Sequence, residues 1–106
     1  MVAPSQDRLR FSDAFRDSVQ SSLKEVLGDS GSRAVFHHLG PLDYDDVEGF
    51  HAKLRAIFGT GALVLEMAIV QHLAVRIDVP VSTLRPDDIV KSASLARAST
   101  ERRRKA

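Results

Sequence analysis

The segment at residues 60–77, TGALVLEMAIVQHLAVRI, most constrains what this chain can fold into, because its apolar residues lie on every side of a predicted helix. At about 100° per residue, these side chains point in all directions from the helix axis and leave no polar face for water. Such a helix must be enclosed, either by the other helices of its own chain or between two copies of it. We therefore expect residues 60–77 to form the central helix of a compact bundle.

Four further segments carry apolar residues at i, i+3 and i+4 spacing and end at glycine or proline, as helices of a globular protein do. They are residues 12–27, a helix of about eight residues that ends at Gly40, residues 44–58, and residues 86–98. Gly28 and Gly59 are expected to stop the first and third of these helices, and Pro80 separates the fourth helix from the fifth. The predicted fold is therefore an all-α, five-helix bundle.

The predicted domain organisation is simple, because 106 residues are enough for one hydrophobic core and too few for two. Residues 1–11 are expected to form a flexible leader, residues 12–98 a single helical domain, and residues 99–106 a basic, disordered tail. The leader lacks the apolar core of a signal peptide, and the run at 60–77 is interrupted by polar residues, which makes it too short and too polar to span a bilayer. We therefore predict a cytoplasmic protein.

Composition and motif spacing argue against catalysis and against a bound metal or cofactor. With 15 Lys and Arg against 14 Asp and Glu, the net charge of +1 creates no global field for nucleic acid or anionic lipid. The chain has no cysteine, and its four histidines show none of the helical spacing of a metal site. Gly59-Thr60-Gly61 lacks the lysine and the preceding strand of a phosphate loop, so we interpret it as a sharp corner between two helices.

Glu66 is the one acidic residue inside the apolar helix, and its neighbours three and four residues away are all apolar. If that side of the helix is covered, the carboxylate needs a partner from another helix. The candidates are Arg33 and His38 on the second helix and Arg55 on the third, and arginine is preferred because its fork can donate two hydrogen bonds to a carboxylate. The alternative interpretation is that Glu66 reaches solvent near the start of its helix.

The basic run Arg102-Arg103-Arg104-Lys105 is the one local concentration of positive charge. Together with the fifth helix it is the surface that a nucleic acid could contact, and this defines an alternative function as a small nucleic-acid-binding regulator. The other interpretation is a solubilising end, and we expect nucleic acid not to be a partner.

The order of several short motifs resembles the Nitrosopumilus output domains, which are small helical modules of archaeal signal-transduction proteins. The resemblance spans roughly residues 15–95 and is carried by the motifs LKEVLG, AVFHHL, FHAKLRAIFG and GALVLE, which begin at Leu23, Ala34, Phe50 and Gly61. It implies an archaeal source and a role in signalling or regulation, and it implies no active site.

These expectations combine into a functional hypothesis, which is a non-catalytic output or adaptor module that binds other proteins. The second helix is short and the fifth has a thin apolar stripe, so their cover of the central helix is expected to be incomplete. We therefore also predict a weak homodimer that closes the gap.

Overall fold

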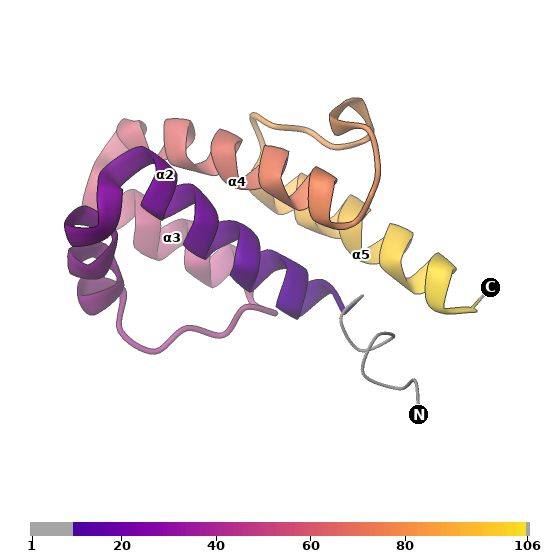
Figure 1. Ribbon diagram of the computed structural model, residues 1–106, viewed down its shortest axis with the longest axis horizontal. Coiled ribbons are helices and arrows are strands. Elements are labelled where there is room, and N and C mark those ends of the chain that lie inside the picture. The colour runs from indigo at the N-terminus through magenta and orange to yellow at the C-terminus, as the bar shows by residue number, and fades with distance from the viewer. Residues whose placement is uncertain (1–9, 106) are drawn as a thin grey trace.

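The computed structural model describes residues 10–105, and the side chains of residues 10–102. Within this range the chain is helical and contains no strand (Figure 1), which confirms the all-α prediction. The elements in chain order are α2 (Phe11–Leu39), α3 (Val47–Phe58), the 3-10 turn η1 (Gly59–Gly61), α4 (Ala62–Arg76), the 3-10 turn η2 (Val81–Thr83) and α5 (Ile89–Lys105).

The predicted five-helix bundle is wrong, because the first two predicted helices are one kinked helix, α2. Gly28 has φ 78° and ψ 175°, a conformation that breaks the helical path as expected. Helical structure resumes directly at Asp29, however, so no loop separates the two predicted helices. In Figure 1 the last part of α2 turns sharply away from the first part. Gly28 therefore bends the helix where we had expected it to separate two helices.

The remaining helices fold back against α2. Figure 1 shows α2 and α4 running side by side in opposite directions, and α3 and α4 as the arms of a hairpin. Phe15 of α2 stands at the centre of the aromatic packing, with its ring 5.5 Å from that of Phe50 in α3. Fully or almost fully buried side chains come from each of α2, α3, α4 and α5, and they include Val19, Leu23, Leu54, Ile69, Leu73, Ile89 and Ala96.

The prediction that residues 60–77 form an enclosed central helix is also wrong. One side of α4 is buried, with Ile69, Val70 and Leu73 at most 1% exposed. On the other side, Val64 is 64% exposed and Val75 is 77% exposed. Within residues 10–105, α4 thus has one side against the core and one side open, because no separate helix covers the face that carries Val64 and Val75.

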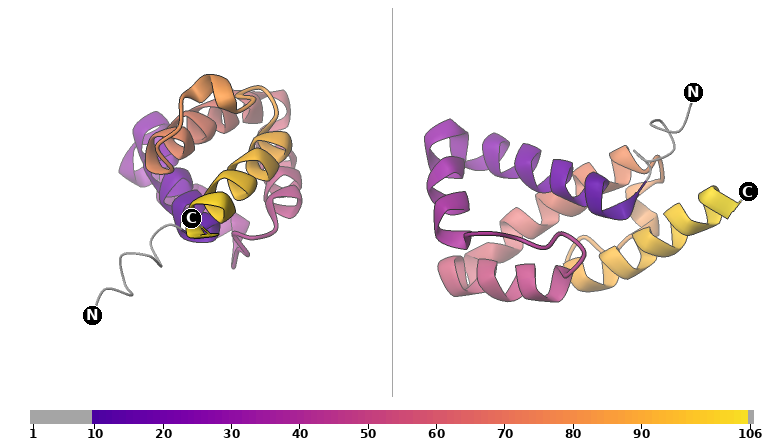
Figure 2. Two further views of the ribbon diagram at one scale, coloured as in Figure 1. Left: turned by 90° about the vertical axis from the view of Figure 1, so that its right-hand side faces the viewer. Right: turned by 90° about the horizontal axis from the view of Figure 1, so that it is seen from below.

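The corner between α3 and α4 forms where it was predicted. Gly59 has φ 60° and ends α3, and its N–H donates to the carbonyl of Arg55. Val47–Arg76 taken as one segment is long and apolar enough to cross a membrane, by length and composition only, and a third of its most apolar window is buried. In Figure 2 this segment is two helices that diverge from η1. Neither the 12 residues of α3 nor the 15 of α4 reach the roughly 20 that a spanning helix needs.

The prediction of a disordered tail from residue 99 is wrong, because α5 continues to Lys105. Ser99 and Thr100 are buried, and the Thr100 hydroxyl donates to the carbonyl of Arg97 over 3.0 Å. Burial on α5 thus continues through Thr100, beyond the end of the apolar stripe. At the other end, residues 1–9 of the predicted leader lie outside the described residues, and Phe11, which we had included in it, is buried as the first residue of α2.

Candidate interaction surface

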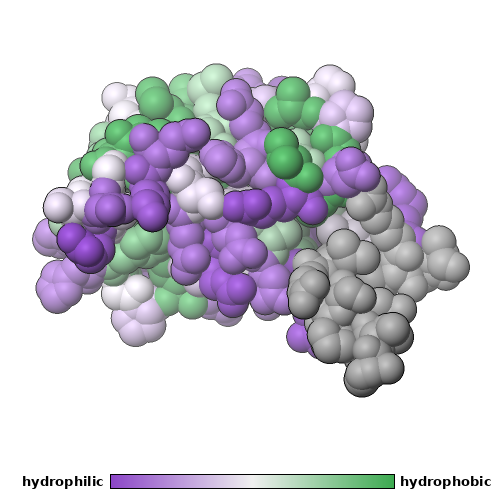
Figure 3. All heavy atoms as spheres, viewed as in Figure 1, coloured by the Kyte–Doolittle hydropathy of each residue, from purple (hydrophilic) through white to green (hydrophobic). Residues whose placement is uncertain are grey.

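The most distinctive surface feature is the outer face of α4, which we define as Leu63, Val64, Met67, Ala68, Gln71 and Val75. Four of its apolar side chains are exposed by 37% to 77%. Figure 3 shows hydrophobic atoms gathered along the upper part of the molecule, over which α4 runs in Figure 1. Single exposed apolar residues are ordinary, but a row of them on one helix makes this face the candidate interaction surface.

Helical spacing makes the outer face of α4 a continuous strip. Gln71 and Val75 each lie within about 20° of Val64 around the helix axis, because seven and eleven residues are close to whole numbers of turns. Met67 and Ala68 flank this line on either side. No residue of the strip is charged. The strip is therefore an uncharged, mostly apolar surface with one amide, Gln71, near its middle.

Polar contacts between α2 and α4 form one border of this strip. The Nε2 atom of His72 lies 3.1 Å from Oε1 of Glu25, and the guanidinium of Arg76 donates to the Ser21 hydroxyl over 2.6 Å. A shallow hollow of about 240 Å³ is lined by Glu25, Gln71, His72 and Val75. The strip thus has the anatomy of a small protein interface, with an apolar centre and a polar rim.

Glu66 is buried, as the first interpretation of the sequence required, and its side chain is 4% exposed. Its partner is His51 of α3, whose Nδ1 lies 2.5 Å from Oε2 of Glu66. The three predicted partners, Arg33, His38 and Arg55, are all exposed. The prediction of a buried carboxylate paired from another helix is confirmed, and the predicted identity of the partner is wrong.

The faces of α3 explain why His51, and not Arg55, is the partner. At about 100° per residue, the buried side chains of Val47, Phe50 and Leu54 span about 60° around the axis of α3. His51 lies about 40° beyond the edge of this buried face and Arg55 about 80° beyond it, which agrees with a partly buried imidazole and an exposed guanidinium. Counting residues from the corner at residues 59–61 would have favoured Arg55, because Arg55 and Glu66 lie at similar distances from Thr60. The signal in the sequence is instead the position of His51 beside the apolar stripe of α3.

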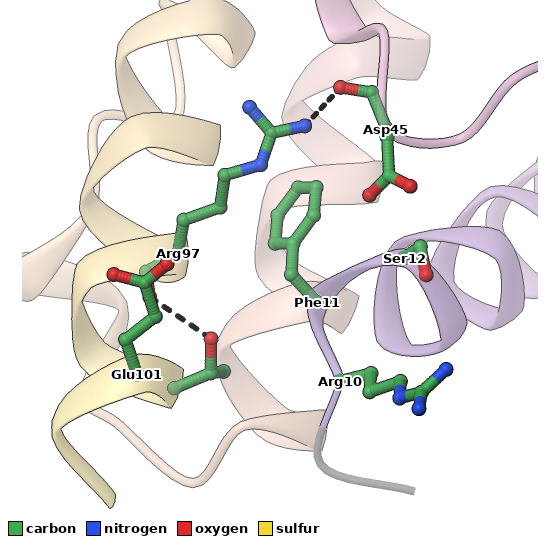
Figure 4. A pocket seen from close by; sticks show the side chains of 7 residues that line it. Arg10, Phe11, Ser12, Asp45, Arg97 and Glu101 are labelled. Carbon is green, nitrogen blue, oxygen red and sulfur yellow. Dashed lines mark hydrogen bonds between the residues drawn. The ribbon is translucent and has the colours of Figure 1, made fainter. Parts of the chain in front are cut away.

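Arg97 forms a second polar cluster that the sequence analysis missed. Its guanidinium lies over the Phe11 ring, 4.6 Å from the ring centroid, and donates to the backbone carbonyl of Asp45. Figure 4 shows this side chain bridging α5, the start of α2 and the loop before α3. A polar pocket of about 260 Å³ opens beside it, lined by Arg10, Phe11, Ser12, Asp45, Arg97, Thr100 and Glu101. The arrangement suits a structural clamp, because the guanidinium is engaged on both sides.

The structure also describes part of the basic tail and the histidines. Arg102 is exposed on α5, and the backbone of residues 103–105 continues the same helix. Among the described residues, no three of His, Asp and Glu are grouped so that they could hold a metal ion. The histidines instead make pairwise contacts, with His37 and His38 stacked edge to face at 6.3 Å.

No family model matches the sequence, and no match was found among the curated proteins or the solved structures compared with it. The candidate surface therefore has to be interpreted from its own chemistry.

Proposed function

We propose that this chain is a non-catalytic protein-interaction module, an output or adaptor domain that binds through the outer face of α4. The observation that carries the proposal is the exposure of Val64 and Val75 on a helix whose opposite side forms the core. Leaving these side chains in water forgoes part of the roughly 1.5–3 kcal/mol that burial of each would contribute. A binding partner recovers that free energy when it covers the strip.

The cellular setting of the module is part of the same proposal. The resemblance to Nitrosopumilus output domains supports a role in archaeal signalling or regulation, and this part rests on that resemblance alone. A chain of 106 residues with no cysteine suits the reducing cytoplasm, where disulfides are rare. The proposed module therefore works in the cytoplasm and contributes contacts to a complex while its partners supply any chemistry.

Site-specific photo-crosslinking in the cell that makes the protein tests this function. A benzophenone amino acid at Val64 is expected to give a covalent adduct with a protein. The matched control carries the same amino acid at Ser94, which is exposed on α5, away from the outer face of α4. Adducts that are equally scarce at both positions would show that the strip has no protein partner and would refute the proposal.

One observation favours the alternative function, a nucleic-acid-binding regulator. Because α5 stays helical through Lys105, its four terminal basic residues stand on one helix that projects from the body (Figure 1). Micromolar binding of arbitrary duplex DNA that disappears at high salt, and on truncation after Glu101, would support this alternative. Lysine substitutions on the outer face of α4 would not weaken such binding, which separates the two functions.

A further inference from the structure

We propose that the outer face of α4 binds a second copy of this chain, with the two α4 helices antiparallel about a two-fold axis that passes between Ala68 and Gln71. The inference rests on the proposed function, since it names the occupant of the same surface. Three properties of the strip support a self-complementary contact: its spacing, its charge and its size.

The spacing of the strip is symmetric about its centre. In an antiparallel pair of identical helices, the sequence positions of two residues that face each other always add up to the same value. With the axis between Ala68 and Gln71, Val64 of each copy faces Val75 of the other. The two most exposed side chains of the helix thus cover each other twice, and a small residue and an amide meet at the centre.

The charge of the strip suits a contact between identical surfaces. A two-fold axis brings every charged group near it toward its own copy, so charges there would repel. From Leu63 to Val75 the outer face of α4 contains no charged residue. The nearest charged contacts, Glu25 with His72 and Arg76 with Ser21, lie at the rim and are engaged within the chain.

The size of the strip predicts a weak, reversible dimer. The exposed fractions of Leu63, Val64, Met67 and Val75, which are 42%, 64%, 37% and 77%, leave a strip of about 350 Å². This area is in the range of the largest apolar patch on a typical monomer, a patch that is often functional. Because roughly 60% of an interface is apolar, such a strip implies a contact of about 600 Å² per copy. The total of about 1,200 Å² is at the lower limit of specific interfaces.

Cysteine cross-linking tests the geometry directly, because the natural chain has no cysteine. Gln71→Cys places the two thiols next to the axis, where the Cα atoms are close enough for a disulfide, and mild oxidation is expected to link most of the protein into dimers. The isosteric control Ser94→Cys, exposed on α5, is expected to stay monomeric under the same conditions. Equal cross-linking of the two variants would overturn the proposal.

Sedimentation equilibrium tests the same contact without cross-linking. Val64→Lys and Val75→Lys are expected to raise the dissociation constant at least tenfold, because each brings a charge against an apolar partner twice. Ala52→Lys, on the exposed side of α3, is the matched control and is expected to leave the dissociation constant unchanged. A parent protein that stays monomeric up to millimolar concentration would overturn the dimer.

The outcomes also separate this inference from the proposed function. A Val64 photo-adduct with twice the mass of the chain supports the dimer, and an adduct of another mass overturns the dimer while the interaction function stands. Absence of a protein adduct overturns both. A monomeric parent that sediments with anionic lipid vesicles would point to a different occupant. If Val64→Lys also abolishes the binding to vesicles, the occupant is a membrane surface and both proposals fail.

Discussion

The buried pair of Glu66 and His51 allows the most quantitative prediction. The change His51→Ala removes the imidazole and leaves a carboxylate that is 4% exposed without its partner. Burial without a partner is costly for a carboxylate, because the surrounding side chains cannot replace the lost hydrogen bond or water. We therefore expect His51→Ala to destabilise the fold.

The magnitude follows from how far solvent reaches the pair. Breaking a fully buried ion pair costs about 3–5 kcal/mol, and leaving a neutral buried polar group unsatisfied costs about 1–3 kcal/mol. The His51 side chain is 34% exposed, so water can enter the space that it leaves and solvate part of the carboxylate. We expect a loss of about 1–3 kcal/mol, which for a domain of this size lowers Tm by about 4–12 °C.

The assay is reversible thermal and urea unfolding followed by helical circular dichroism. The matched control is Arg55→Ala, one turn from His51 on α3, and it is expected to change stability by less than about 0.5 kcal/mol because Arg55 is exposed. In a double-mutant cycle, His51→Ala and Glu66→Ala should be coupled by about 1 kcal/mol or more.

The reasoning has a clear refutation. If His51→Ala, Glu66→Gln and Glu66→Ala all unfold like the parent, the buried-pair interpretation is wrong and Glu66 makes no net contribution to the fold. Additive effects of His51→Ala and Glu66→Ala would show that the two side chains act independently.

Three further predictions concern other parts of the fold. Gly28→Ala is expected to destabilise the protein by about 1–2 kcal/mol in urea unfolding, because a residue with a Cβ adopts the φ of 78° at Gly28 only at a cost. An added Cβ would meet no atom within 4 Å, so an unchanged urea midpoint would show that α2 can straighten without cost. Burial raises the pKa of Tyr44 above its ordinary value, so its contribution to stability is present below about pH 10 and is lost as the pH rises through the higher pKa of the folded state. Between pH 9 and pH 11, about one unit on either side of the ordinary tyrosine pKa, Tyr44→Phe should therefore lose less stability than the parent, and parallel losses would contradict this. Arg97→Ala is expected to lower stability by about 1–2 kcal/mol, because it removes the contacts with the Phe11 ring and the Asp45 carbonyl. Arg97→Lys is expected to lose less stability than Arg97→Ala, and equal stabilities of the parent and both variants would argue against a clamp.

The features that the sequence alone determined are those that depend on local chemistry. Gly28 and Gly59 interrupt helices where predicted, because each takes a positive φ that residues with a Cβ adopt at a cost. Ile89, Ala93 and Ala96 are buried on α5, as the i, i+3 and i+4 spacing indicated. The need of Glu66 for a partner was also visible, because it follows from the apolar residues around one carboxylate.

Only the tertiary structure decided which groups meet and which surfaces remain open. The partner of Glu66 depends on which residues of α3 face α4 in the folded chain, and this partner is His51 where an arginine was predicted. The exposure of Val64 depends on how many helices are available to cover α4, and among the described residues the merging of two predicted helices into α2 left that side open. Periodicity shows which faces of a helix are apolar, but burial requires neighbours brought from elsewhere in the chain or from another molecule. For α4 the described part of the chain supplies neighbours on one side, and the packing of the fold leaves Val64 and Val75 on the other side exposed.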